Sequence, residues 1–323
     1  MKIAPNLFKI LVVLTLCLSV SYAIVYTGIQ FFSQDSLVKI PDTAKYLALY
    51  HKEPVIGHWR WRVLVPLLAR SLPDLPGYFF SERRETTDLW QAKVKFGIVN
   101  FAFLSATGIL FFYFLGALGF FAWEALLGVL LFYTARPVIQ SAGIPMTDAA
   151  GYFFLLLCFF GLLRKDLVLL SAGFFGGIFA RETVFLAFPA CLLLPDGIRF
   201  KIKACSVTGL ILLGYCVYRF YIFPDPGENY FNFPLVFSPA FQAGCFSKIN
   251  RLLDLFSSFG PVWFFAFYAL FLPKVPVLLR KWSWLILIAL FMAGNTGRIL
   301  FPVFPVVIPL AVFGIRQSLR SGQ

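Results

Sequence analysis

Polar residues are rare along most of this chain, and the apolar stretches between them have the length of membrane-spanning helices. Apolar runs repeat from Phe8 to the C-terminus, and a helix needs about 20 residues to cross the hydrocarbon core of a bilayer. The period-2 alternation of apolar and polar residues that a membrane strand requires is absent. The pattern therefore predicts an all-α fold, a polytopic transmembrane helical bundle.

Hydropathy divides the chain into about ten crossings within one integral-membrane domain. The domain covers residues 1–323, and the expected spans are residues 8–30, 96–116, 119–134, 147–163, 167–180, 183–194, 204–223, 256–272, 282–294 and 300–315. The spans at 167–180 and 183–194 are short for full crossings, so one of them is expected to be tilted, broken or re-entrant.

Two long segments, residues 31–95 and 224–255, fall on the same side of the predicted membrane. In the first, we expect a short helix over Thr43–Tyr50, capped by Asp42. A second helix is expected over Trp59–Ser71, where aromatic and cationic residues accompany an apolar stripe, as in helices that lie in the membrane interface. This first loop is therefore predicted to form a platform on the membrane surface.

Composition and charge support this interpretation and set the orientation. The chain is 60% hydrophobic and only 13% charged, with a formal net charge of +13. Most of that excess lies in the short loops on the side of the N-terminus, and the positive-inside rule then places both termini in the cytoplasm. We expect a multi-pass protein of the bacterial inner membrane. Because the positive-inside bias accounts for the charge, the sequence gives no reason to expect nucleic acid as a partner.

Metal chemistry has little support in the sequence. Five of the six cysteines lie in apolar runs at spacings unlike those of metal ligands, Cys245 is alone in a loop, and there are only two histidines. The cysteines are typical of small buried hydrophobic residues, without a disulfide framework. We therefore expect neither a cofactor nor a required metal.

Five short polar clusters interrupt the apolar pattern, and counting crossings places all of them on the extracytoplasmic face. They are Asp42 with Tyr46, His58 to Arg62 with Arg60 between two tryptophans, Thr147-Asp148, Arg181-Glu182, and Asn295 to Arg298. Ionisable groups at membrane depth are costly and usually mark function. The shared face is therefore the expected location of the chemistry.

The first two clusters each admit a functional and a structural interpretation. Asp42 near the membrane surface suits a general base acting on a hydroxyl group, or a plain helix N-cap. The guanidinium groups of Arg60 and Arg62 suit bidentate phosphate binding, or an aromatic and cationic belt at the interface.

The other clusters are open to the same two interpretations. Asp148 begins a span, where capping is the structural alternative. Arg181 and Glu182 are adjacent, so each needs a different partner, and Asp148 is a candidate partner for Arg181. These two residues alternatively form part of a buried ion pair that fixes helix packing. Arg298 suits a lipid-borne phosphate, or is an arginine that reaches the interface from a helix end.

Taken in chain order, the clusters resemble the GT-C superfamily of multi-span glycosyltransferases. The matching residues are Asp42 in a long first outer loop, the stretch Arg62-Val63-Leu64-Val65-Pro66-Leu67-Leu68, then Thr147-Asp148, Arg181-Glu182, and Gly297-Arg298-Ile299-Leu300-Phe301-Pro302. The resemblance implies transfer of a sugar from a polyprenyl-phosphate carrier to a glycan, lipid or protein acceptor on the extracytoplasmic face, with inversion and without a metal.

The resemblance also implies roles for individual residues. Asp42 would be the general base, and Arg298, with Arg60 or Arg62, would hold the carrier phosphate. The substrate and carrier would further contact Tyr46, His58, Asp148, Arg181 and Glu182. The chain lacks the adjacent acidic pair of better-known members, which leaves Asp35 as an alternative base. It also lacks an Asp-x-Asp motif and a large soluble C-terminal domain.

Two other function classes remain open on the sequence. A transporter or flippase for a lipid-linked glycan would place charged residues along a path through the membrane rather than at one face. A glycan polymerase would share the outer-face chemistry but use lipid-diphosphate-linked oligosaccharides. Product length would separate a polymerase from a transferase.

Overall fold

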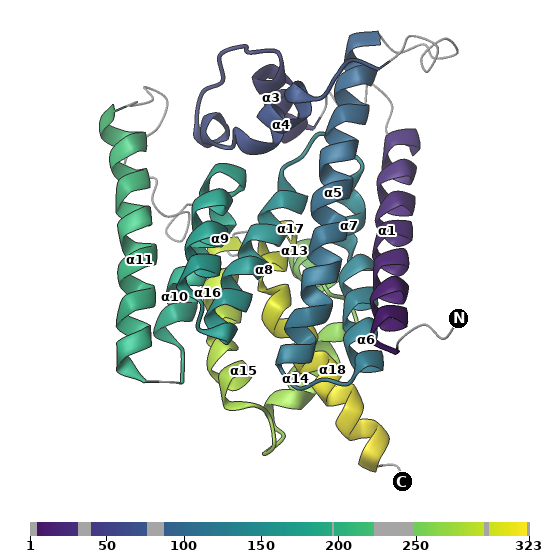
Figure 1. Cartoon of the computed structure of the whole chain (residues 1–323), viewed down its shortest axis with the longest axis vertical. Coiled ribbons are helices and arrows are strands. Elements are labelled where there is room, and N and C mark those ends of the chain that lie inside the picture. The colour runs from purple at the N-terminus through teal and green to yellow at the C-terminus, as the bar shows by residue number, and fades with distance from the viewer. Residues whose placement is uncertain are drawn as a thin grey trace.

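Helices are the only regular elements in the parts of the chain that the structure describes. The computed structural model describes residues 5–31, 40–75, 87–195, 197–222, 249–293 and 297–321 (Figure 1). The expected all-α fold is confirmed over these ranges. Asp35 and most of the second long loop, residues 223–248, lie outside them.

The helices form a bundle with a small helical cap at one end. The longer helices are α1 (Pro5–Phe31), α5 (Thr87–Ala117), α8 (Asp148–Arg164), α9 (Leu167–Ala180), α11 (Ile198–Val217) and α18 (Phe304–Ser321). Between them lie α6 (Ala122–Tyr133), α7 (Arg136–Ala142), α10 (Ala187–Leu192), α13 (Ile249–Ser257), α14 (Val262–Leu270), α15 (Val277–Trp282), α16 (Trp284–Ala293) and α17 (Gly297–Leu300). The cap consists of α3 (Pro41–Tyr50) and α4 (Leu64–Ser71) at the upper end of the bundle (Figure 1).

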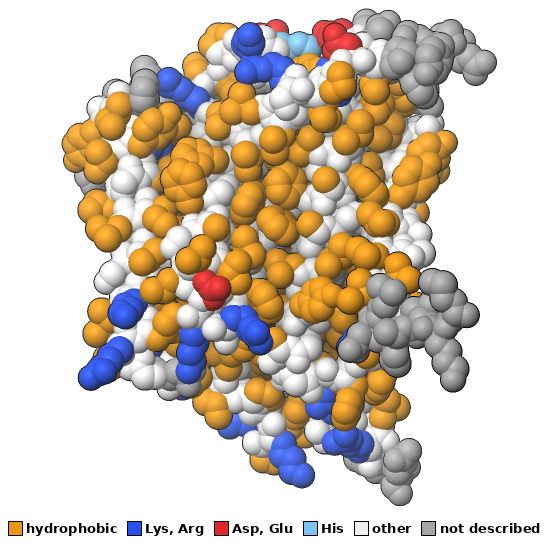
Figure 2. All heavy atoms as spheres, viewed as in Figure 1, with side chains coloured by type: hydrophobic (Ala, Val, Ile, Leu, Met, Phe, Trp, Pro, Cys, Tyr) orange, Lys and Arg blue, Asp and Glu red, His pale blue; other side chains and the backbone are white. Residues whose placement is uncertain are grey.

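Four described helices are long and apolar enough to cross a membrane. They are Phe8–Phe31, Asp88–Ala117, Ile198–Ile222 and Phe301–Arg320, and α6 with α7 adds a fifth if this pair, bent by 59°, is one span. Figure 2 shows a broad hydrophobic band across the middle of the face in view, with charged side chains gathered mainly above and below it. These features are compatible with a membrane protein, and the expected count of about ten crossings stays a prediction.

The expected boundaries are close for α8 and α9, but α5 begins nine residues before the expected start at residue 96, and the expected span at 256–272 is divided between α13 and α14. Two further differences are instructive. The helix expected over Trp59–Ser71 is wrong as a continuous element, because a 3-10 helix at His58–Trp61 ends before α4 begins at Leu64. The interruption falls at Arg62-Val63, where the chain turns so that Arg62 points into the bundle. The expected span at 183–194 is a 3-10 helix, Glu182–Leu186, followed by α10.

A cluster of aromatic rings joins the C-terminal helix to the middle of the bundle. Phe304 lies 4.9 Å from Phe132 and 5.4 Å from Phe111, measured between ring centroids, and Phe301 lies 5.2 Å from Tyr152. All five residues are buried. Tilted and edge-to-face contacts of this kind stabilise a core beyond their buried area, so they fix the segment that carries Arg298.

The segment before α8 is held by two close contacts. Gly143 meets Gly28 of α1, and a Cβ atom added at Gly28 would lie 2.3 Å from the Gly143 Cα atom. The amide of buried Asn100 in α5 donates to the backbone oxygens of Ala142 and Ile144, at 3.2 and 3.1 Å. Both contacts set the entry of the chain into α8 and therefore the position of Asp148.

This packing predicts that Gly28→Ala destabilises the protein. The added methyl group would overlap the backbone at Gly143, and overpacking of this kind costs about 1–3 kcal/mol. The measurement is thermal unfolding of the purified variant. Gly214→Ala is the matched control, because a Cβ atom at Gly214 in α11 meets nothing within 4 Å. Equal melting temperatures for the two variants would contradict the contact.

Candidate functional site

Residues from all five polar clusters meet at the upper end of the bundle, beneath the α3 and α4 cap. The network joins residues that are far apart in the sequence, from Asp42 to Arg298. Its members come from α3, the segment between the 3-10 helix and α4, the start of α8, the 3-10 helix after α9, and α17.

Asp42 faces the site and does not cap its helix. Ile40 occupies the N-cap position of α3, and no side chain bonds to the cap, so the expected Asp42 cap is wrong. One Asp42 oxygen accepts a 2.9 Å hydrogen bond from the indole nitrogen of Trp59, and the other is paired with the Arg298 guanidinium. The side chains of Asp42 and Arg298 are 22% and 28% exposed, so a ligand can reach both.

Asp148 holds the centre of the network. Its carboxylate is fully buried, pairs with Arg181, and lies 3.3 Å from the Arg298 Nε atom. The expected pairing of Asp148 with Arg181 is confirmed. Thr147 rather than Asp148 is the N-cap and makes no side-chain cap bond, and Asp148 lies in the first turn of α8, where the helix dipole favours a carboxylate. Gly151, one turn further along α8, leaves room for the stem of Arg181, whose Cβ atom would lie 3.0 Å from an added Cβ.

A second arm of the network runs from Tyr46 to Glu182. Arg62 donates from Nε to the Glu182 carboxylate at 2.7 Å and from Nη1 to the Tyr46 hydroxyl at 2.8 Å. The hydroxyl of Thr147 donates to the same Tyr46 oxygen at 3.2 Å. Arg181 and Glu182 therefore have different partners, as their adjacency in the sequence implied.

Arg60 and Arg62 differ in their placement. The guanidinium of Arg60 lies 5.2 Å from the ring centroid of Trp61, outside the network of ion pairs. The Arg62 side chain is 11% exposed and joins two arms of the site. The side chain of His58, and residues Asn295 and Thr296, lie outside the described part of the structure.

Arg219 and Tyr215 also belong to the site but were not singled out from the sequence, and Trp59 was expected there only as an aromatic residue of the second cluster. Trp59 bonds to Asp42. Arg219, at the end of α11, lies 3.9 Å from the Glu182 carboxylate and donates to the Tyr215 hydroxyl at 3.2 Å. A lone cation at the end of a long apolar run was the available signal for Arg219.

The site combines several cations with buried polar atoms that make no hydrogen bond in the described part of the chain. Arg62 pairs with Glu182, Arg181 and Arg298 both contact Asp148, and Arg298 also pairs with Asp42. Asp148 Oδ2, Arg181 Nε, Thr183 Oγ1 and Trp61 Nε1 make no hydrogen bond with a described residue. Buried polar atoms are normally paired, so these orphan atoms, next to the guanidiniums of Arg62, Arg181 and Arg298, fit a polar ligand. Among the described residues, no group of three His, Cys, Asp or Glu side chains is placed to hold a metal.

Electrostatics keep the exposed members of the site ionised. Burial raises the pKa of Asp42, but the charge and hydrogen bond of Arg298, the Trp59 hydrogen bond and the charge of Arg62 outweigh it, so the pKa lies below its usual value. For Arg62, burial lowers the pKa, but the charge of Glu182 and the interaction with Tyr46 outweigh this effect, so the pKa lies above its usual value. Asp42 is therefore a carboxylate, and a weak base as long as Arg298 is paired with it.

The lowered pKa of Asp42 predicts how stability depends on pH. A carboxyl group whose pKa is lower in the folded protein stabilises the fold above its unfolded value of about 3.9, and this stabilisation is lost as the pH falls through the folded-state pKa. The difference in melting temperature between the wild type and Asp42→Asn should therefore be constant from about pH 8 to about pH 5 and shrink below about pH 4. Thermal unfolding across this range measures it. A difference that disappears near neutral pH would contradict the ion pair.

Arg60 and Arg62 form a matched pair for testing the network. Arg62→Gln leaves the Glu182 carboxylate, which is 18% exposed, without its nearest cation. Breaking a buried pair costs up to about 3–5 kcal/mol, and for this partly exposed pair we expect roughly 2 kcal/mol. Arg60→Gln should change stability by less than about 0.5 kcal/mol. Unfolding of both variants under the same conditions is the measurement. Similar losses in both would mean that Arg62 is only an interfacial cation.

Comparison with known proteins does not identify a family for this chain. No family model, no curated protein and no solved structure matches the chain. The functional argument therefore depends on the residues of the site.

Proposed function

We propose that this protein is an integral-membrane glycosyltransferase that moves a sugar from a polyprenyl-phosphate carrier to an acceptor on the extracytoplasmic face. The proposal includes the multi-span arrangement of about ten crossings with both termini in the cytoplasm of a bacterial inner membrane. The observation that carries it is the direct pairing of a reachable carboxylate, Asp42, with a reachable guanidinium, Arg298, next to the buried guanidinium of Arg181.

The reaction needs a base and an anion site close together. In the proposed step, Asp42 takes the proton of an acceptor hydroxyl group, and the acceptor oxygen attacks the anomeric carbon. The bond from that carbon to the phosphate oxygen breaks with inversion, and the lipid phosphate leaves with the electron pair. Preorganised cations stabilise the charge that develops on a leaving phosphate. Arg298 is the cation that contacts the base directly, and Arg181 lies behind it on Asp148.

Because Asp42 is paired with Arg298, binding of the carrier phosphate should also change the basicity of Asp42. A phosphate that binds Arg298 competes with the Asp42 carboxylate for the same guanidinium. Loss of this contact removes part of the influence that lowers the pKa of Asp42, so the carboxylate becomes a better base when the donor is bound. The second arm, with Glu182, Arg219 and Tyr215, offers hydroxyl-binding groups for the sugar or the acceptor.

The proposal predicts opposite effects of two substitutions on donor binding. Asp42→Asn should lower kcat by about 100-fold or more, because it removes the base. Its affinity for the donor should be retained or increased, since the amide competes less for Arg298. Arg298→Ala should weaken donor binding and lower kcat/KM by about 100-fold or more.

The measurement uses purified protein in lipid nanodiscs with a panel of labelled polyprenyl-phosphate sugars. Asp88→Asn and Arg60→Gln are the controls: the Asp88 carboxylate is 76% exposed in the first turn of α5, and Arg60 lies outside the network. Both controls should keep wild-type turnover. Normal turnover in Asp42→Asn and Arg298→Ala would show that these two residues are not part of the active site. Processive elongation of diphosphate-linked oligosaccharides would instead favour a polymerase, and transbilayer movement without sugar transfer a flippase.

A further inference from the structure

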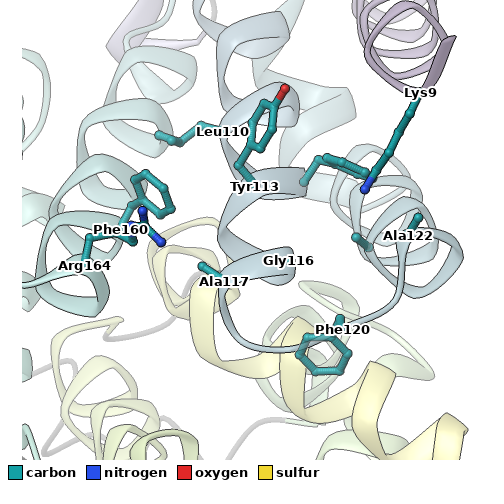
Figure 3. Close-up of a pocket in the computed structure, with 11 residues that line it drawn as sticks. Lys9, Leu110, Tyr113, Gly116, Ala117, Phe120, Ala122, Phe160 and Arg164 are labelled. Atoms are coloured by element: carbon teal, nitrogen blue, oxygen red, sulfur yellow. The ribbon is translucent and has the colours of Figure 1, made fainter. Parts of the chain in front are cut away.

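A groove lies at the opposite end of the molecule from the candidate site. It has a volume of about 450 Å³ and is bounded by α1, α5, α6 and α8 (Figure 3). Ring side chains, among them Tyr113 and Phe160, line it together with the small residues Gly116 and Ala117. Cavities of this size hold small molecules or parts of larger ones.

The groove has cations on two sides and no acidic lining residue. Lys9 reaches it from α1 and Arg164 from the end of α8, with the lower part of α5 between them (Figure 3). The Lys9 ammonium lies 5.3 Å from the ring centroid of Phe112. Neither cation makes a hydrogen bond or an ion pair that compensates its charge in the described part of the chain, whereas nearby Arg316 is paired with Glu124. The groove therefore carries two uncompensated positive charges over an apolar floor.

The groove lies where a membrane lipid could reach it. α1 and α5 are both long enough to span a membrane, and the groove lies near the lower end of each. Tyr113, which lines it, is 47% exposed on the outer surface of the bundle. In a bilayer spanned by α1 and α5, the apolar floor would open toward hydrocarbon, and the two cations, near the lower ends of these helices, would lie close to the headgroups. Basic pockets between membrane helices bind acidic headgroups.

We propose that this groove binds an anionic glycerophospholipid of the leaflet at this end of the protein. Lys9 and Arg164 bind the phosphate-containing headgroup, and an acyl chain lies along α5 over Gly116 and Ala117. The site is separate from the Asp42 and Arg298 network and does not depend on the proposed transferase activity.

Gly116 provides a direct test that leaves both charges in place. A Cβ atom added there meets nothing within 4 Å, and the same holds for Gly214 on α11. Gly116→Leu should place its side chain in the groove, because the added Cβ atom has free space, and Gly214→Leu is the matched control on a different helix. A double variant, Lys9→Gln with Arg164→Gln, tests the contribution of the two charges. Its control is the double variant Lys203→Gln with Lys274→Gln, because both of these lysines are exposed and lie outside the groove.

The measurement is native mass spectrometry of the full chain, titrated with phosphatidylglycerol or phosphatidylcholine of the same chain length. The wild type should retain phosphatidylglycerol preferentially. Each charge removed from the groove should weaken this binding about five-fold, so the double variant should lose about 25-fold, and Gly116→Leu should also lose the bound lipid. Both controls should bind as the wild type does. Equal retention of the two lipids by the wild type, or equal losses in the groove and control variants, would overturn the proposal.

Discussion

The candidate site depends on one buried carboxylate, that of Asp148. A charge removed from water is tolerated only when it is paired, and Asp148 has no exposed surface. It therefore requires both Arg181 and Arg298, which approach from different segments of the chain. Because Arg298 also contacts Asp42, the position of the first loop is tied to the last span through Asp148. The same ion pairs therefore form the candidate site and hold distant segments of the chain together.

The position of Asp148 is set by packing rather than by local helix chemistry. Asn100 binds the backbone just before α8, and the contact of Gly28 with Gly143 brings α1 against the same segment. The aromatic cluster around Phe304 fixes the C-terminal helix close behind Arg298. A buried ion pair requires well-defined geometry to offset its desolvation, and these rigid contacts supply it.

Hydropathy predicted the limits of some helices because these helices coincide with apolar runs: α8 and α9 begin and end within a residue or two of the expected limits. The convergence of the polar clusters could also be predicted, since counting crossings places them on one face. Their partners could not. An acidic residue near a helix start is compatible with capping or with a distant ion pair, and both Asp42 and Asp148 form distant pairs. Arg219 and Asn100 act only through residues far away in the sequence, so no local pattern marks them.

The two ends of the molecule handle charge in different ways, and this difference bears on what each end binds. At the upper end the cations are paired with carboxylates, so an anionic ligand has to displace Asp42 from Arg298, which favours a ligand that uses the freed carboxylate. Catalysis gains from such an exchange, because the group that is released is the one that the reaction needs. At the lower end neither Lys9 nor Arg164 has an ion pair with a described residue, and no acidic residue lines the groove, so an anion can bind there without displacing a described protein group. Binding without exchange suits a structural lipid rather than a substrate.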